Sequence, residues 1–178
     1  MNKNIKPSAG FGNESARIKV YIDNRPPLEQ YQQLSKVVPI QAGEILEIGR
    51  LTGNHWRKIF NVYAKLCFEL SPSSFNTWQV LRDQQLLQKG SQQALLFNQT
   101  SFHQYTKQSS ADDIHIIMGR TFASSLINNN QFSADLLWLN EEFAINKTFR
   151  LIVCPYFDYR QLSNIKISYL VTLINSFK

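Results

Sequence analysis

Residues 150–168, RLIVCPYFDYRQLSNIKIS, contain a strand, a loop and the start of a helix, and the fold is best predicted from this stretch. The run Leu151-Ile152-Val153 is short and wholly apolar, which is typical of a buried strand. Cys154-Pro155 ends the run, because proline cannot donate to a sheet ladder. An aromatic and charged loop follows, and Ser163-Asn164 opens a helix. Ligands of open α/β sheets bind at such strand ends, so this loop is a candidate site.

Three more strands are predicted upstream. Residues 17–22 (RIKVYI), 94–97 (ALLF) and 114–118 (IHIIM) are strand-like, and residues 149–153 make the fourth strand. The last three are almost wholly apolar, as strands covered on both faces should be. Helical segments separate the strands, and this order favours parallel pairing. We therefore predict an α/β fold, a three-layer α/β/α domain with a short, central, mostly parallel four-stranded sheet.

The helices are predicted from apolar residues at helical spacing and from capping residues. The predicted helices are residues 28–34, 44–51, 56–70, a segment from Ser71 or Ser74 to 87, and residues 121–127, 133–143 and 165–174. The last segment also fits strand alternation. Residues 1–16 are polar and predict a flexible tail, and residues 17–178 predict a single domain.

Composition narrows the function classes. The chain has 178 residues, 43% of them hydrophobic, and a net charge of +6, which is compatible with a nucleic-acid partner. We expect no membrane span and no secretory signal, because no apolar run is long enough. Cys67 and Cys154 lie in apolar runs, which predicts buried free thiols and a cytoplasmic location. The cysteines and histidines lack metal-ligand spacing, so we expect no metal site.

Recognised catalytic motifs are absent from the sequence. It has no GxxxxGK[ST] or GxGxxG phosphate loop, no GxSxG elbow, no HExxH and no EF-hand loop. These absences disfavour the usual nucleotide, hydrolase and metal chemistries, and we expect no cofactor.

Polar loops follow all four predicted strands, and parallel strands would bring these loops to one edge of the sheet. The candidate site residues are Asp23, Asn24, Asn98, Phe102, His103, Arg120, Tyr156, Asp158 and Arg160. Amides, carboxylates and aromatics could recognise a base, with arginine on phosphate. Each residue also has a structural interpretation. Asn24 would serve a turn, Asp158 would pair with Arg160 or cap a turn, and Gly119 before Arg120 would make a tight turn or an anion site.

The order of these features resembles the uracil–DNA glycosylase superfamily, and most closely its mismatch-specific uracil/thymine branch. The similar stretches, which span most of residues 18–175, are 20–28 (VYIDNRPPL), 53–60 (GNHWRKIF), 86–100 (LLQKGSQQALLFNQT), 116–123 (IIMGRTFA) and 153–162. The resemblance implies that Asn24 or Asp23 positions an attacking water and that Asn98 lies near the base edge. It implies that Phe102 or Tyr156 stacks on a flipped base and that the 154–160 loop presses on the nucleic acid.

Two functional hypotheses follow. The first is a nucleic-acid-binding, glycosylase-like hydrolase of a base N-glycosidic bond, with Asp23 and Asn24 as catalytic residues. The second is a non-catalytic protein of the same fold that binds a protein or a small ligand. The second rests on Cys154-Pro155-Tyr156, which stands where the family has His-Pro-Ser and so lacks a histidine to stabilise a departing base.

Overall fold

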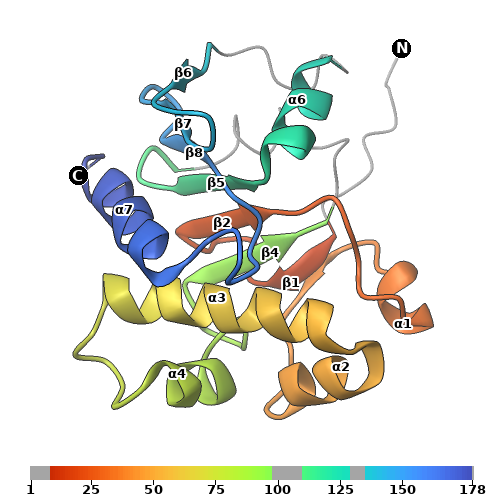
Figure 1. Cartoon of the computed structure of the whole chain (residues 1–178). Helices are drawn as coiled ribbons and strands as arrows, with labels where there is room; N and C mark the ends of the chain where they lie inside the picture. Colours follow the sequence, from red (N-terminus) through yellow and green to blue (C-terminus); the bar gives the residue numbers. More distant parts are fainter. Residues whose placement is uncertain (1–8, 98–109, 129–134, 178) are drawn as a thin grey trace.

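The computed structural model describes residues 9–97, 110–128 and 135–177. Helices and strands alternate around one sheet, so the prediction of an α/β fold is confirmed (Figure 1). The strands are β1 Gly10–Gly12, β2 Ile18–Tyr21, β3 Val37–Val38, β4 Gln93–Leu96, β5 Ile114–Met118, β6 Leu137–Trp138, β7 Ala144–Asn146 and β8 Leu151–Cys154. The helices are α1 Glu29–Gln32, α2 Glu44–Thr52, α3 Asn54–Leu70, α4 Trp78–Gln84, α6 Arg120–Asn128 and α7 Asn164–Asn175.

Four parallel strands form the centre of the sheet, in the order β4-β2-β5-β8. Val20 of β2 lies opposite Leu95 on one side and Ile116 on the other, and Ile116 in turn lies opposite Ile152. All four residues are fully buried, as the apolar composition of these strands predicts. The four central strands are those that the sequence predicts, and their parallel pairing is as expected.

The whole sheet is larger than predicted. It has eight strands in the order β3-β1-β4-β2-β5-β8-β7-β6, so the prediction of a four-stranded sheet is wrong. At one edge β1 pairs antiparallel with β4, and residues 10–12 therefore form a buried strand inside the segment predicted as a flexible tail. At the other edge β7 pairs antiparallel with β8 and with β6.

A short hairpin replaces the helix that the sequence predicts over residues 133–143. The Asn140 side chain accepts hydrogen bonds from the backbone N–H groups of Glu142 and Phe143, both at 2.8 Å. Such an asparagine turn reverses the chain and competes with helix formation. In the predicted helix Leu137 and Phe143 would both face inward. Phe143 is buried, whereas Leu137 is 60% exposed.

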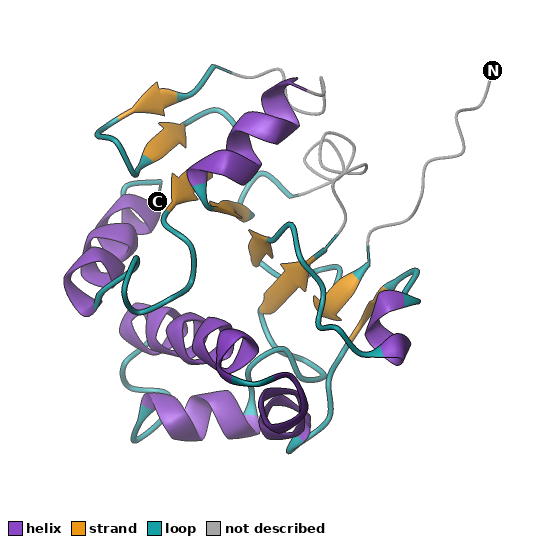
Figure 2. Ribbon diagram, turned by 45° about the vertical axis from the view of Figure 1, so that its right-hand side comes forward, coloured by secondary structure: helices purple, strands orange, loops and turns teal. Residues whose placement is uncertain are grey.

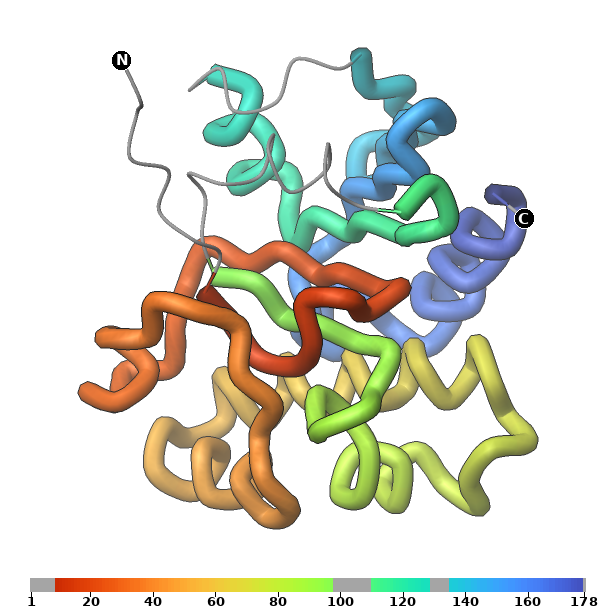
Figure 3. The backbone as a smooth tube through the Cα atoms, turned by 180° about the vertical axis from the view of Figure 1, so that it is seen from behind, coloured from red at the N-terminus to blue at the C-terminus, as the bar shows by residue number. Residues whose placement is uncertain are grey.

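Helices cover both faces of the sheet. On one face α2, α3, α4 and α7 enclose the larger core cluster, and α3 lies directly against the strands (Figures 1 and 2). The Tyr63 hydroxyl on α3 anchors this packing by donating to the carbonyl of Ala94 at 3.0 Å. On the opposite face α6 packs on the smaller cluster, which includes Ile117 and Val153 (Figure 3).

The chain order of the central strands creates a crevice. After β2 the chain crosses to β4 on one side, and it later returns to β5 on the other side of β2. The loops that leave the carboxyl ends of β2 and β5 therefore diverge. Ligand sites of open α/β sheets form at such a switch point.

Candidate functional site

A cleft of about 370 Å³ opens at the carboxyl ends of the central strands, at this switch point. Its walls come from the loops after β2, β5 and β8, which contribute Asp23, Asn24, Gly119, Arg120 and Tyr156. The expectation that these loops share one edge is therefore confirmed for three of the four loops. Of the other predicted site residues, Asn98, Phe102 and His103 lie outside the described residues.

Three side chains from three different elements meet at the cleft. The Tyr156 hydroxyl lies 3.1 Å from Nε2 of His55, and the Asn24 side-chain amide lies 3.4 Å from both groups. The rings of His55 and Tyr156 stack with their centroids 5.6 Å apart. The longer contacts are weak hydrogen bonds, so the three groups can exchange partners when a ligand enters.

His55 is the site residue that sequence reasoning missed. It is the second residue of α3, and the helix begins directly after Gly53. The backbone angles of Gly53, φ 83° and ψ −163°, suit glycine. The sequence singles out residues 53–60 only as a segment similar to the glycosylase superfamily. One feature of the sequence could have indicated a role for His55. A glycine that ends one predicted helix stands just before it, so the histidine falls in the first turn of the next helix. Its role depends on α3 beginning beside the loops that follow the strands, which is a tertiary feature.

Tyr156 is held in its neutral form. The pKa of its hydroxyl is raised to about 12, mainly by burial and also by the carboxylates of Asp23 and Asp158, which disfavour a nearby phenolate. At neutral pH this hydroxyl can therefore donate one hydrogen bond and accept another.

Asp23 supplies an available carboxylate. Its side chain is exposed and lines the cleft, and it makes no hydrogen bond or ion pair with any other described residue. A free carboxylate next to a neutral tyrosine can orient a water molecule or accept its proton.

Asp158 and Arg160 form the turn that follows the cleft. Asp158 accepts from the Arg160 backbone N–H at 3.0 Å and from Lys58 at 2.9 Å, and these donors lower the pKa of its carboxyl. Asp158 thus caps a turn, one of its two structural interpretations, and its ion-pair partner is Lys58. The guanidinium of Arg160 stays exposed beside the Tyr159 ring.

Arg120 and Gly119 form the third wall. The Arg120 guanidinium donates to the Glu141 carbonyl at 2.8 Å and lies 4.4 Å from the centre of the Trp138 ring. Gly119 has a φ of 96°, and α6 begins directly after it at the cleft. The tight turn is confirmed, and it places the start of the nine-residue helix α6 at the cleft; the interpretation as an anion site stays a prediction.

The two cysteines lie outside this chemistry. Cys67 and Cys154 are free and buried, as predicted, and burial raises the pKa of both thiols. Neither is therefore a thiolate nucleophile at neutral pH. Across the described parts of the chain, no three His, Cys, Asp or Glu side chains gather as a metal site would require. No helix in these parts has both the length and the apolar character needed to cross a bilayer.

Comparison with known proteins identifies a family, but the function of that family is unknown. No curated protein and no solved structure matches the chain. Residues 9–175 match the model of a family of unknown function, DUF6942. The match covers nearly the whole chain, and the protein therefore belongs to the DUF6942 family.

Proposed function

We propose that the protein binds nucleic acid at this cleft and hydrolyses the N-glycosidic bond of a base. The observation that carries the proposal is that Asp23, Asn24 and Tyr156 line one cleft at the switch point of the sheet, and that His55 contacts both Asn24 and Tyr156 there. A carboxylate and an amide on one loop, opposed by an imidazole and a phenol, are the groups that this hydrolysis needs.

The chemistry divides between the two sides of the cleft. Asp23 and Asn24 orient a water molecule, whose oxygen attacks the sugar C1′ while the bond from C1′ to the base nitrogen breaks. The bonding electron pair leaves with the base, and Asp23 accepts the proton of the water. His55 and Tyr156 donate hydrogen bonds to the departing base and so stabilise its negative charge.

His55 answers the main objection to hydrolysis. The motif Cys154-Pro155-Tyr156 has no histidine, but His55 reaches the same place from α3 and contacts the hydroxyl of Tyr156. An imidazole that can donate a hydrogen bond is thus available beside the leaving base from another element. This substitution supports a hydrolytic role over the non-catalytic alternative.

The test is base excision from defined substrates. Purified protein is incubated with duplex and single-stranded DNA that contains uracil or mismatched thymine, and strand breaks are scored after alkali. We expect cleavage that falls by roughly 10²–10⁴-fold in Asp23→Asn and Asn24→Ala. His55→Gln should lower the rate as well. Asp83→Asn, outside the cleft on α4, is the matched control and should cleave like the wild type.

Two results would count against the proposal. Absence of both cleavage and salt-sensitive DNA binding would exclude it and leave the non-catalytic alternative. Cleavage that survives both Asp23→Asn and Asn24→Ala would keep the activity but refute the site.

A further inference from the structure

An exposed tyrosine lies just outside the cleft. Tyr159, in the loop after β8, is 53% exposed, whereas Phe157 in the same loop is fully buried. The hydrophobic core therefore takes the ring of Phe157 and leaves that of Tyr159 in solvent. An aromatic ring with a polar tip is a frequent contact residue at binding surfaces.

The turn that carries this ring is held firmly. Asp158 accepts hydrogen bonds from the Arg160 backbone N–H at 3.0 Å and from Lys58 at 2.9 Å. The backbone carbonyl of Asp158 accepts from the N–H group of Leu162 at 2.8 Å. Nζ of Lys58 also lies 4.8 Å from the centre of the Tyr159 ring. A ring that is fixed before binding loses little conformational freedom when a ligand stacks on it.

Two elements connect this ring to the cleft. On α3, Lys58 lies one turn after His55, and helix neighbours at this spacing have Cβ atoms about 5–6 Å apart. In the loop after β8, Tyr159 lies three residues after Tyr156, and the turn between them is closed by the Asp158 N–H, which donates to the Tyr156 carbonyl at 2.7 Å. His55 and Tyr156 contact each other at the cleft. Lys58 and Tyr159 form the next pair, just outside it.

A free cation stands next to the ring. The Arg160 guanidinium is exposed and lies 6.0 Å from the centre of the Tyr159 ring. Within the part of the chain that the structure describes, no hydrogen bond or ion pair engages this guanidinium. The charge of Lys58, in contrast, is balanced by Asp158. An exposed ring for a base and a free cation for a phosphate are the groups by which proteins bind single-stranded nucleic acid.

We propose that Tyr159 is a stacking platform for single-stranded DNA. It takes a base next to the one that enters the cleft, and Arg160 contacts a phosphate of the same strand. This inference rests on the proposed function, because it takes the cleft as the nucleic-acid site. In a duplex the neighbouring base would have to leave its own stack at a cost, whereas in a single strand it is free to stack on the ring. Single-stranded DNA is therefore the preferred substrate.

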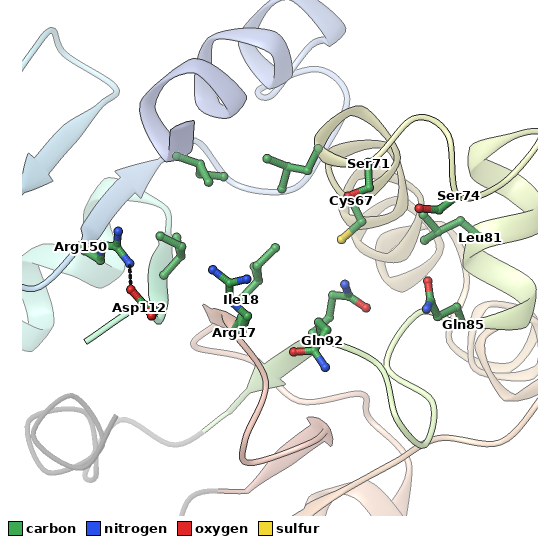
Figure 4. Close-up of a pocket in the computed structure, with 14 residues that line it drawn as sticks. Arg17, Ile18, Cys67, Ser71, Ser74, Leu81, Gln85, Gln92, Asp112 and Arg150 are labelled. Carbon is green, nitrogen blue, oxygen red and sulfur yellow. Dashed lines mark hydrogen bonds and ion pairs between the residues drawn. The ribbon is translucent and has the colours of Figure 1, made fainter. Parts of the chain in front are cut away.

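A second cavity, at the opposite edge of the sheet, supplies a control position. Its volume is about 360 Å³, and its walls come from the starts of β2, β4, β5 and β8, the end of α3, and α4 and α7 (Figure 4). Arg17 lines this cavity and is exposed, and none of the described residues pairs with its side chain. Arg17 therefore matches Arg160 in charge and exposure but lies far along the strands from the cleft.

The test compares binding of a labelled single strand and of its duplex by fluorescence anisotropy. A strand of adenine and cytosine alone carries no uracil or thymine, so its binding is measured apart from excision. We expect the single strand to bind more tightly than the duplex, and Tyr159→Ala to weaken binding of the single strand roughly 5–150-fold. Tyr159→Trp, which keeps a stacking ring, should bind like the wild type. So should Tyr169→Ala, the matched control, which removes another exposed tyrosine on α7.

The charge variants give a second measurement. Arg160→Gln should weaken binding of the single strand and reduce its salt slope by about 0.7, the value for one phosphate contact on a single strand. Arg17→Gln should leave the slope unchanged. Equal slopes for the two variants would overturn the contact assigned to Arg160.

Three results would refute the platform. They are tighter binding of the duplex, wild-type binding by Tyr159→Ala, and an equal loss for single strand and duplex, which a side chain wedged into the duplex would cause. The proposed function fails in a different way. Asp23→Asn should lower excision without weakening binding of the strand. Binding that depends on Tyr159 without any excision would refute hydrolysis, while the platform would stand.

Discussion

The buried imidazole of His115 ties the stability of this protein to pH. It lies 2.8 Å from the Tyr21 hydroxyl on the sheet face opposite α3, next to the buried ion pair of Lys19 and Asp113. The pKa of His115 is lowered from 6.5 to about 4, mainly by burial and also by the charge of Lys19, while Asp113 opposes the shift. The folded protein thus keeps this histidine neutral where the unfolded chain is protonated.

The sign of the pH effect follows from this depressed pKa. Below pH 6.5 the unfolded state binds a proton that the folded state does not, so the free energy of unfolding falls as the pH falls toward 4. We expect His115 to remove about 2–3 kcal/mol between neutral pH and about pH 4.5. Urea denaturation at several pH values measures this loss. His115→Gln, which keeps a hydrogen-bonding side chain, should flatten the curve, and equal pH slopes would contradict the assignment.

Single residues differ in how far the sequence predicts them. An apolar strand pattern around His115 and apolar runs around Cys67 and Cys154 indicate burial, and all three are buried. Asp23 and Tyr156 come to one cleft because each follows a central strand. The position of His55 beside Tyr156 could not be predicted, because it depends on which distant element faces the strand loops.

The junction between α2 and α3 sets the position of His55, and two glycines near it make a matched pair. Gly53 has backbone angles that are strained for any other residue, although a Cβ there would meet nothing within 4 Å. Gly49 lies inside α2, where a Cβ would make a close but ordinary contact with Arg57 at 3.4 Å. The two glycines therefore differ in their backbone conformation, and at neither position does a Cβ atom clash with its surroundings.

We expect opposite effects from alanine at these positions. Gly53→Ala should destabilise the protein by about 1–3 kcal/mol through backbone strain. Gly49→Ala should stabilise it by about 0.5–1 kcal/mol, because alanine is the better residue inside a helix. Chemical denaturation measures both. A neutral Gly53→Ala would show that the junction relaxes, and His55 would then not be fixed by it.

The sequence predicts those helices and strands in which apolar residues repeat at helical or strand spacing over enough residues to be recognised. The apolar face of α3 and the buried runs of β4, β5 and β8 were predicted to within a few residues. The two- and three-residue strands β1, β3, β6 and β7 were not, because they carry too few residues for a period. The helix predicted over residues 133–143 is the clearest error of this kind. The turn formed by the Asn140 side chain overrides the helical spacing of the apolar residues there.

On the scale of the molecule, chain order and charge distribution matter more than any one element. Alternation of strands and helices predicts the parallel centre, and from that the meeting of the strand loops. It does not predict the edges, because β1 and β7 join the sheet through pairing with β4 and β8 rather than through a local pattern. The two cavities lie at opposite edges of the same sheet, and three strands, β2, β5 and β8, reach both of them.

The net charge of +6 makes DNA binding at the cleft testable through its salt dependence. Three cations lie in or beside the cleft, namely Arg120, Lys58 and Arg160, and Arg160 is exposed. If each meets one phosphate, the logarithm of the binding constant should fall with the logarithm of salt concentration at a slope of about −2 to −3. A much steeper slope would require the scattered positive residues of the whole surface, and a flat one would exclude phosphate contacts.

Arg160→Gln sharpens this measurement. Removing one phosphate contact should weaken DNA binding without regard to sequence and reduce the salt slope by about 1. Lys89→Gln removes the same charge from an exposed position outside both cavities and is the matched control. Fluorescence anisotropy with labelled duplex DNA over a salt series gives both slopes. Equal slopes for the two variants would show that DNA is attracted by the overall charge. This result would contradict nucleic-acid binding at the cleft.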